Sequence, residues 1–499
     1  MLSRRSLLSS GPLAAAGALA LSSCGSSSAD GGGGSDGSLS WMSVFHTPAT
    51  PDPHGAVMTA LLDHTGIDVE FQWVPDANKE EKINSALASG SVADINGLNQ
   101  LTMPSLRDAL ASGLFWDVED YLGDYPNIAA IDPKILDGAR LDGVLYGVPQ
   151  QQPLARYGVL VRQDWLDELG LDTPHTLDEL REVAQAFTEG DPTGTGQETV
   201  GIIDRAESFL WGFPELAGYF GAGAFFEESD DGTIIPSFMT DPFKEAMAWY
   251  RDIYANGWMN QEFATMQKQN QLQAIAQDKA GIVFTALFEA PGYIATATSI
   301  DPDNPAEWTL INDMTYRDVP RRIVSDTGGG MGGLMAFSTR SLTSEEDLRR
   351  GLSLIEALLD ETSLDLMTNG IEGTHYEVDA DGAVTITDRP LWEQEVQPFS
   401  GARPSQLYYS RSTDPYVNEA NEKISENAEY AVVNPAQSLT SATYDSSWAV
   451  IEQSVQDAWN NYMVGQIDMG DFDAAIEAQR SQGLDDVIAE YTESYDASR

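Results

Sequence analysis

The chain has 499 residues, of which 78 are acidic and 27 are Lys or Arg, so its formal net charge at pH 7 is −51. A surface this negative repels nucleic acid and anionic lipid, which argues against either as a partner. The hydrophobic content of 42% and aromatic content of 9% are too high for a disordered chain and predict a packed globular body, with two domains expected at this length.

The chain begins like an exported protein. Arg4 and Arg5 lie in a short basic head, and they resemble the pair of a twin-arginine export signal. The apolar stretch 13–21 is shorter than the roughly 20 residues that span a bilayer. This order predicts a signal peptide over residues 1–23.

Cys24 is the only cysteine, so it cannot form an internal disulfide or complete a zinc site. Residues 21–24 resemble a lipobox, in which the cysteine is acylated and becomes the first mature residue. A buried thiol is the alternative, but the Gly- and Ser-rich neighbours could not bury it. We expect a lipidated Cys24, a flexible linker over 24–38, and a protein anchored on the extracellular face of the cell membrane.

After the linker, strand and helix patterns alternate. Residues 39–45 form an apolar segment and residues 66–74 alternate polar and apolar side chains, which predicts two strands. A helix is predicted between them at 54–64, another at 78–89, and then a short strand at 92–95. This order predicts an α/β fold with parallel strand pairing.

Three later helices are marked by their ends. Thr176 and Glu179 form a capping box. Asp241-Pro242 opens a helix that ends at Gly257, and Thr343-x-x-Glu346 caps a third. The apolar stripes of the last two helices are expected to face the core: Phe243, Met247, Tyr250 and Tyr254 in one, and Leu348, Leu352, Ile355 and Leu359 in the other.

Common catalytic and metal motifs are missing from the sequence. The five histidines make no H-E-x-x-H pair, and there is no C-x-x-C, phosphate-binding loop or G-x-S-x-G elbow. The glycines of 328–333 lack the lysine of a phosphate loop and predict a turn or hinge. Paired carboxylates could serve a glycoside hydrolase, but among 78 acids any spacing occurs by chance.

The stretch 142–202 carries the most specific pattern: "DGVLYGVP", "RQDWLDELGLDTPHTLDEL" and "DPTGTG" follow one another. "ANGWMNQEF" at 255–263, "NGIEGTHYEV" at 369–378 and "QGLDDVIAEYTESYD" at 482–496 continue the series. These pieces, in this order, resemble the extracellular solute-binding lipoproteins of ABC importers, in the carbohydrate-binding branch that includes aldouronate and alginate oligosaccharide binders.

The resemblance implies a two-lobed α/β protein of periplasmic-binding type with a ligand cleft at the hinge. Lobe 1 is expected at 39–152 plus about 285–345, and lobe 2 at 153–284 plus about 346–499. Such a protein captures an oligosaccharide, acts as a monomer, delivers the sugar to an ABC permease, and needs no cofactor. An exported glycoside hydrolase, or a binder of a non-sugar solute on the same scaffold, are the alternatives.

Aromatic rings stack on the apolar faces of sugars, and amide or charged side chains bind their hydroxyls. Residues of this kind follow the "YGVP" turn at the first expected lobe crossing: Gln150, Gln151, Gln152, Arg156 and Tyr157. They could instead coat the end of a strand. Arg156 and the Arg321-Arg322 pair would suit an acidic sugar without establishing one.

Other candidate ligand contacts are His46 after the first strand, Trp211, Phe288 near a second crossing, and Glu372 with Tyr376. Trp211 fits a cleft-lining loop or a core helix equally well. Glu372 and Tyr376 match the family's pattern, although that segment could simply build the lobe. Trp165 belongs to a helix common to the family, and we expect it to pack in the core.

The loop 191–198 is similar to the calcium loop D-x-[DN]-x-[DN]-G, which holds a structural calcium in some relatives. Threonines replace the acid or amide at two positions, and the distant bidentate glutamate is missing. The oxygen donors would come from Asp191, Thr193, Thr195, Gln197 and Glu198. A structural Ca²⁺ and a glycine-rich turn without metal both stay open.

Overall fold

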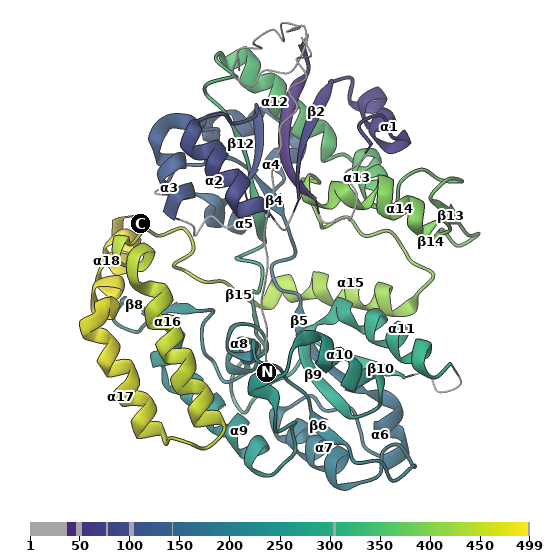
Figure 1. Cartoon of the computed structure of the whole chain (residues 1–499), viewed down its shortest axis with the longest axis vertical. Helices are drawn as coiled ribbons and strands as arrows, with labels where there is room; N and C mark the ends of the chain where they lie inside the picture. The colour runs from purple at the N-terminus through teal and green to yellow at the C-terminus, as the bar shows by residue number, and fades with distance from the viewer. Residues whose placement is uncertain are drawn as a thin grey trace, which may run out of the picture. The chain divides into compact units, whose positions relative to one another are not determined.

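The computed structural model describes residues 37–45, 52–75, 78–98, 104–141, 143–302 and 306–497. Within these residues the strands form two main sheets (Figure 1). The first is a five-stranded sheet of order β2-β1-β3-β12-β4, in which β1 runs parallel to β2 and β3, and β12 runs antiparallel to β3 and β4. Its strands are β1 (Leu39–Phe45), β2 (Val69–Pro75), β3 (Ile95–Leu98), β4 (Gly147–Gln151) and β12 (Met331–Phe337).

The early strand and helix predictions are confirmed, with one shift. The third strand covers Ile95–Leu98 rather than 92–95. The backbone before it is held by side chains instead of a neighbouring strand, because Ala93 N donates to Asn96 Oδ1 (3.0 Å) and Asp94 N donates to Ser40 Oγ (2.9 Å). The parallel pairing of β1 with β2 and β3 is as expected.

Helices around this sheet complete one hydrophobic core, which we call the first core. They are α1 (Ala56–Thr65), α2 (Lys79–Ser89), α3 (Pro104–Ala109), α4 (Pro126–Ala129), α5 (Pro133–Ala139), α12 (Glu345–Leu358), α13 (Glu361–Thr368) and α14 (Arg389–Glu395), with the hairpin β13 (Tyr376–Val378) and β14 (Val384–Ile386). The predicted stripe of α12 is buried at Leu348, Leu352 and Ile355. Its cap lies one residue later than predicted, because Ser344 and Asp347 make the reciprocal capping bonds.

The second sheet has the order β10-β5-β9-β6, and helices cover both of its faces. Neighbouring residues of β5 point to opposite faces of this sheet. Val159 and Val161 belong to the hydrophobic cluster on one face, and Leu160 belongs to the cluster on the other face. We call these two clusters together the second core. Trp165 is buried in it, as predicted. The strands are β5 (Tyr157–Arg162), β6 (Val200–Ile202), β9 (Ala280–Ala286) and β10 (Trp308–Ile311).

The helices of the second core confirm the capping box of Thr176 and Glu179 and the buried face of the helix opened by Asp241-Pro242. They are α6 (Gln163–Leu169), α7 (Leu177–Glu189), α8 (Gly212–Tyr219), α9 (Asp241–Ala255), α10 (Lys268–Ala276), α11 (Ala290–Ile300), α15 (Pro415–Asn427), α16 (Ala442–Met463), α17 (Met469–Gln479) and α18 (Asp485–Ala497). Two small pairings complete it: β7 (Phe226–Glu228) with β8 (Ile234–Pro236), and β11 (Ile323–Val324) with β15 (Ala431–Val432).

The described chain passes between the two cores at 152–156, at 325–330 and again between 402 and 436. The stretch 285–345, predicted for lobe 1, is divided: β10 joins the four-stranded sheet and β12 the five-stranded sheet. The stretch 346–499, predicted for lobe 2, is also divided, because α12 packs in the first core and α16 in the second. The signal peptide, Cys24 and His46 lie outside the described residues. Among the helices that are described, none combines the length and apolar character needed to cross a membrane.

Candidate ligand-binding site

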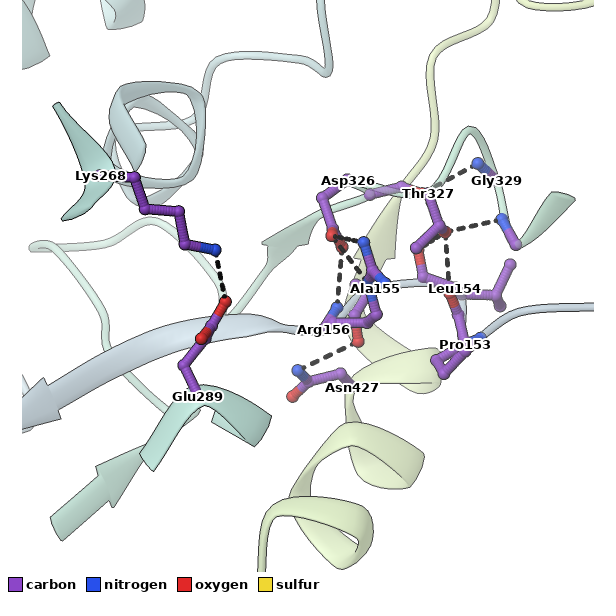
Figure 2. Close-up of polar contacts among 12 residues, drawn as sticks. Pro153, Leu154, Ala155, Arg156, Lys268, Glu289, Asp326, Thr327, Gly329 and Asn427 are labelled. Atoms are coloured by element: carbon purple, nitrogen blue, oxygen red, sulfur yellow. Dashed lines mark hydrogen bonds and ion pairs between the residues drawn. The ribbon is translucent and has the colours of Figure 1, made fainter. Parts of the chain in front are cut away.

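The first passage between the cores is held by Arg156. Its guanidinium donates to Asp326 Oδ2 from Nε (2.8 Å) and Nη2 (2.7 Å), and its backbone N donates to Asp326 Oδ1 (3.0 Å) (Figure 2). The Asp326 side chain is only 4% exposed, whereas that of Arg156 is 26% exposed. The first and second passages are therefore joined by a buried carboxylate with a guanidinium that still reaches solvent.

Polar side chains on either side of this ion pair join the passages further. Thr327 Oγ1 donates to the Pro153 carbonyl oxygen at 2.7 Å and accepts from Gly330 N (3.0 Å). Asn427, at the end of α15, donates to the carbonyls of Ala155 (3.3 Å) and Tyr157 (3.1 Å); Figure 2 shows the bond to Ala155. Because α15 follows directly after the chain crosses for the third time, the second core is joined to the first passage at this level.

One aromatic ring, that of Phe288, lies beside Arg156, and a second, that of Tyr409, is within reach of its charge. Its guanidinium carbon is 5.4 Å from the centroid of Phe288, a residue that is 45% exposed. Tyr409 is 36% exposed; burial raises the pKa of its phenol to about 12, although the nearby charges of Arg156 and Arg403 act to lower it. We call Arg156, Phe288, Asp326 and Tyr409 the crossover site. It offers open ring faces and charged N–H donors together, which suits a ligand with both apolar faces and hydroxyl groups.

Glu289 and Tyr157 are the chain neighbours of Phe288 and Arg156. Glu289, next to Phe288, accepts from Lys268 Nζ at 3.0 Å (Figure 2). Tyr157 follows Arg156, and burial together with the charge of Asp326 raises the pKa of its phenol. Trp211 directly precedes α8 and is 43% exposed, so it is not a core residue.

The three glutamines that precede Arg156 have other partners. Gln150 is buried and its Nε2 donates to the Arg403 carbonyl oxygen at 2.8 Å. Gln151 is buried and exchanges backbone hydrogen bonds with the chain at 404 and 406. Gln152 N donates to the Gly330 carbonyl oxygen at 2.7 Å. These contacts join β4 to later segments, which matches the alternative that they cover a strand end.

Tyr376 is the first residue of β13, and Glu372 forms a β-bridge with it, away from the crossover site. Tyr376 is buried, and its hydroxyl donates to Asp365 Oδ2 at 2.9 Å. Tyr408 donates to the other oxygen of the same carboxylate at 3.0 Å. The structure thus brings Arg156, Tyr157 and Phe288 together, whereas Tyr376 takes part in local packing.

The loop 191–198 is closed by its own hydrogen bonds. Both carboxylate oxygens of Asp191 accept from Gly196 N at 3.0 Å, and the hydroxyls of Thr193 and Thr195 lie 2.7 Å apart. The Gln197 amide donates to the carbonyls of Gln277 and Asp278. Ca²⁺ takes six to eight oxygen ligands, several of them carboxylates. The loop offers two carboxylates, Asp191 and Glu198, and two hydroxyls, which is few for a tight calcium site, and no cluster of three potential metal-binding side chains occurs among the residues described.

A cavity of about 390 Å³ adjoins the second passage. Ser325 and Thr327 line it, while Asp326 between them contacts Arg156, so the passage separates the cavity from the crossover site. We call this cavity the aromatic pocket, after the side chains that dominate its wall: Phe209, Phe225, Phe226, Phe238, Tyr444 and Trp448. These residues, and also Asp326 and Tyr409, are not identified from the sequence, because they come from segments that only the folded chain brings together.

Comparisons with known proteins agree on one family. Residues 53–315 match the family described as bacterial extracellular solute-binding protein. The polygalacturonan/rhamnogalacturonan-binding protein YtcQ of Bacillus subtilis (strain 168) is 34% identical over 92% of this chain and 91% of its own length. Lipoprotein LipO of the same organism is 27% identical over 93% of this chain and 94% of its own.

A solved structure supports the fold. The HMO-binding, ABC-transporter-associated solute-binding protein from Bifidobacterium longum infantis ATCC 15697 matches with a TM-score of 0.71 at 19% identity, covering 93% of this chain and 99% of that one. This likeness confirms the predicted α/β fold of periplasmic-binding type.

Proposed function

Because the chain belongs to the bacterial extracellular solute-binding protein family, we propose that it captures an oligosaccharide outside the cell and delivers it to the permease of an ABC importer. The name of YtcQ supports a carbohydrate ligand, and the association of the Bifidobacterium protein with an ABC transporter supports delivery to a permease. Capture is binding without chemistry, and the protein acts as a monomer.

The observation that carries this proposal is the open ring of Phe288 beside Arg156, where the chain passes between the cores. A sugar ring can stack on Phe288 or Tyr409 while its hydroxyls bind the outward-facing edge of the guanidinium. The hydrogen-bonded passages serve as the hinge about which the cores close on the sugar.

A binding screen tests the proposal directly. The melting temperature of the purified protein is measured with oligogalacturonides, rhamnogalacturonan fragments, maltotriose and 1-kestose. We expect at least one sugar to raise it, since a ligand at 100 times its Kd stabilises the folded state by about 2.7 kcal/mol. A flat response to the whole panel contradicts the proposal and favours a non-sugar solute.

The same samples separate binding from catalysis. After prolonged incubation with the stabilising sugar, we expect its chromatographic profile to be unchanged. Shorter products would favour the exported glycoside hydrolase.

We also propose that Cys24 carries a lipid that anchors the protein on the outer face of the membrane. Support comes from the lipobox-like residues 21–24 and from the name of the relative LipO. Replacing Cys24 by Ser should move the protein from the membrane fraction to the soluble fraction after cell lysis. Persistent sedimentation with membranes would contradict a lipid anchor.

We propose that binding needs no calcium. The hydrogen bonds within 191–198 already hold the turn, and its donor set is poor for a hard cation. Adding 5 mM CaCl₂ after EDTA treatment should change the melting temperature by less than about 1 °C, because a site with a Kd above the ion concentration adds little stability. A clear rise, lost in Asp191→Ala, would show that the loop binds the ion.

A further inference from the structure

Phe225 stands out in the aromatic pocket because its backbone is strained. Its φ is +60°, and Phe226 N donates to the Ala224 carbonyl oxygen across it at 2.6 Å. A three-residue turn with positive φ is rare, and it is unfavourable for a bulky residue. Burial of the side chain does not compensate for this strain, because Phe225 is 39% exposed. Its neighbours Ala224 and Phe226 are buried. Strain of this kind gathers where a side chain is held for a ligand.

The pocket wall around Phe225 supplies both apolar and polar contacts. Tyr444, Trp448 and Phe238 form a row of parallel rings, with ring centroids 5.1 Å and 6.1 Å apart. One oxygen of Glu452 accepts from Trp448 Nε1 at 3.2 Å, which leaves the carboxyl with further acceptor capacity. Gln437 donates to the Gly328 carbonyl oxygen, while its own Oε1 is buried with no hydrogen-bond partner in the described chain.

We propose that the aromatic pocket is a subsite for one neutral sugar ring, with Phe225 as its stacking surface and Gln437 and Glu452 as acceptors for its hydroxyls. This inference rests on the proposed function and adds the substrate class at a defined place. A sugar hydroxyl gives Gln437 Oε1 the donor it lacks, and an aromatic ring covers the apolar face of the sugar. The cavity volume of about 390 Å³ falls within the range of roughly 300–1,000 Å³ of small-molecule sites.

The charges around the pocket favour a neutral ring over a uronate. Arg107 and Glu452 are the charged side chains among the described residues that line it. Arg107 Nη1 donates to the Leu439 carbonyl oxygen (3.2 Å) and lies 3.9 Å from Asp445 Oδ1. Since Arg107 is already paired with Asp445, and Glu452 adds a carboxyl group to the same wall, a carboxylate on the ligand would gain no net attraction.

Two variants of Phe225 separate recognition from support of the fold. Phe225→Leu keeps apolar bulk but removes the flat ring, and Phe225→Gly also relieves the strain. Calorimetric titrations use a rhamnogalacturonan tetrasaccharide, maltotriose, 1-kestose and trigalacturonate. We expect both variants to weaken binding of a probe with a neutral ring by about tenfold or more. We expect Phe225→Gly to melt no lower than the wild type.

Arg317→Gly is the matched control, because Arg317 also has a positive φ (+48°) but is exposed. It should leave every Kd unchanged. If Phe225→Leu binds the sugars with unchanged affinity, the subsite is overturned while the proposed function stands. The same holds if Phe225→Gly has a lower melting temperature but unchanged affinity. If the variants lose as much affinity for trigalacturonate as for the neutral sugars, the preference of the pocket for a neutral ring is overturned. If the wild type binds none of the probes, the proposed function fails and the subsite fails with it.

Discussion

The crossover site and the aromatic pocket share the segment 325–327 but are built in opposite ways. At the crossover site a buried carboxylate fixes a guanidinium, and the rings of Phe288 and Tyr409 are open to solvent. In the aromatic pocket most rings are buried, and only Phe225 combines a strained backbone with an exposed ring. An ion pair therefore holds the crossover site in place, whereas hydrophobic packing holds the aromatic pocket. The two sites should respond differently to substitution.

The largest expected effect comes from removing the carboxylate that holds the crossover site. Asp326→Ala leaves Arg156 without its partner and frees the first passage from the second. We expect the free energy of unfolding, measured by urea titration, to fall by about 2–4 kcal/mol, because one member of a mostly buried ion pair is lost. Arg156 is partly exposed, which keeps the value below that of a fully buried pair.

Glu393→Ala is the control for this variant. It removes an exposed pair with Arg389 within one helix, and it should cost less than about 0.5 kcal/mol. If both variants lose the same small amount, the crossover site is not held by charge.

The second prediction concerns the open ring of the crossover site. For the sugar that stabilises the wild type, Phe288→Leu should lower the binding affinity by about tenfold. The change in unfolding free energy should stay below about 1 kcal/mol, because the ring is nearly half exposed. Titration calorimetry and urea unfolding measure the two quantities. Val378→Ala, in the β13–β14 hairpin, should leave the affinity unchanged. A loss of stability without a loss of affinity would make Phe288 a packing residue.

The sequence predicts residues of the crossover site better than those of the aromatic pocket. Arg156 and Phe288 are found because polar and aromatic residues follow strand ends at an expected crossing. Asp326 and Tyr409 are missed because they lie about 170 and 250 residues from Arg156 in the chain, and only the fold brings Asp326 into contact with Arg156 and Tyr409 within reach of its charge. In the pocket, the positive φ of Phe225 cannot be inferred from its neighbours, since Phe is an unfavourable residue for that conformation.

The third prediction uses Glu215, which lies in α8 between the two sites. The residue is buried, and its Oε2 accepts from Val324 N at 2.9 Å. Burial raises the pKa of its carboxyl to about 8, from an unfolded value of 4.5. Asp326 raises this pKa further, while the neighbouring Tyr219 hydroxyl, the hydrogen bond from Val324 N and the charge of Arg322 act in the opposite direction.

The folded chain therefore binds this proton more tightly than the unfolded chain. The stability that Glu215 contributes is fully present below about pH 4.5 and is lost as the pH rises toward 8. Urea titrations at pH 5, 6.5 and 8 should show the wild type losing up to about 1.4 kcal/mol per pH unit relative to Glu215→Gln. Parallel pH profiles of the two proteins would show that the carboxyl stays charged throughout.

The smallest effect is expected at the exposed ion pair of Lys268 and Glu289, next to Phe288 of the crossover site. Lys268→Ala removes the pair with Glu289, in which the Lys268 side chain is 58% exposed. Such pairs contribute less than about 1 kcal/mol and are screened by salt. We expect unfolding free energies within about 0.5 kcal/mol of the wild type at 150 mM NaCl. A loss comparable to that of Asp326→Ala would mean that exposed charges also hold this site.

Fold class was easier to predict than connectivity. Period and caps identify β1, β2 and the helix of Thr176 correctly, because these signals are local. Which sheet a strand joins is not local: β10 and β12 lie about 20 residues apart and enter different sheets. The hydrogen bonds of Ala93 and Asp94 that delay β3, and the one-residue shift of the α12 cap, likewise depend on side chains rather than on pattern.

The central place of β12 affects how the chain is made on the ribosome. β12 lies between β3 and β4, and about 180 residues of synthesis separate the end of β4 at Gln151 from the start of β12 at Met331. At about 5–20 residues per second, β4 waits roughly 10–40 s for its neighbour. During that interval both edges of β4 and the edge of β3 that will face β12 are unpaired, and such edges invite aggregation. The yield of this protein should therefore depend on translation speed and chaperone supply.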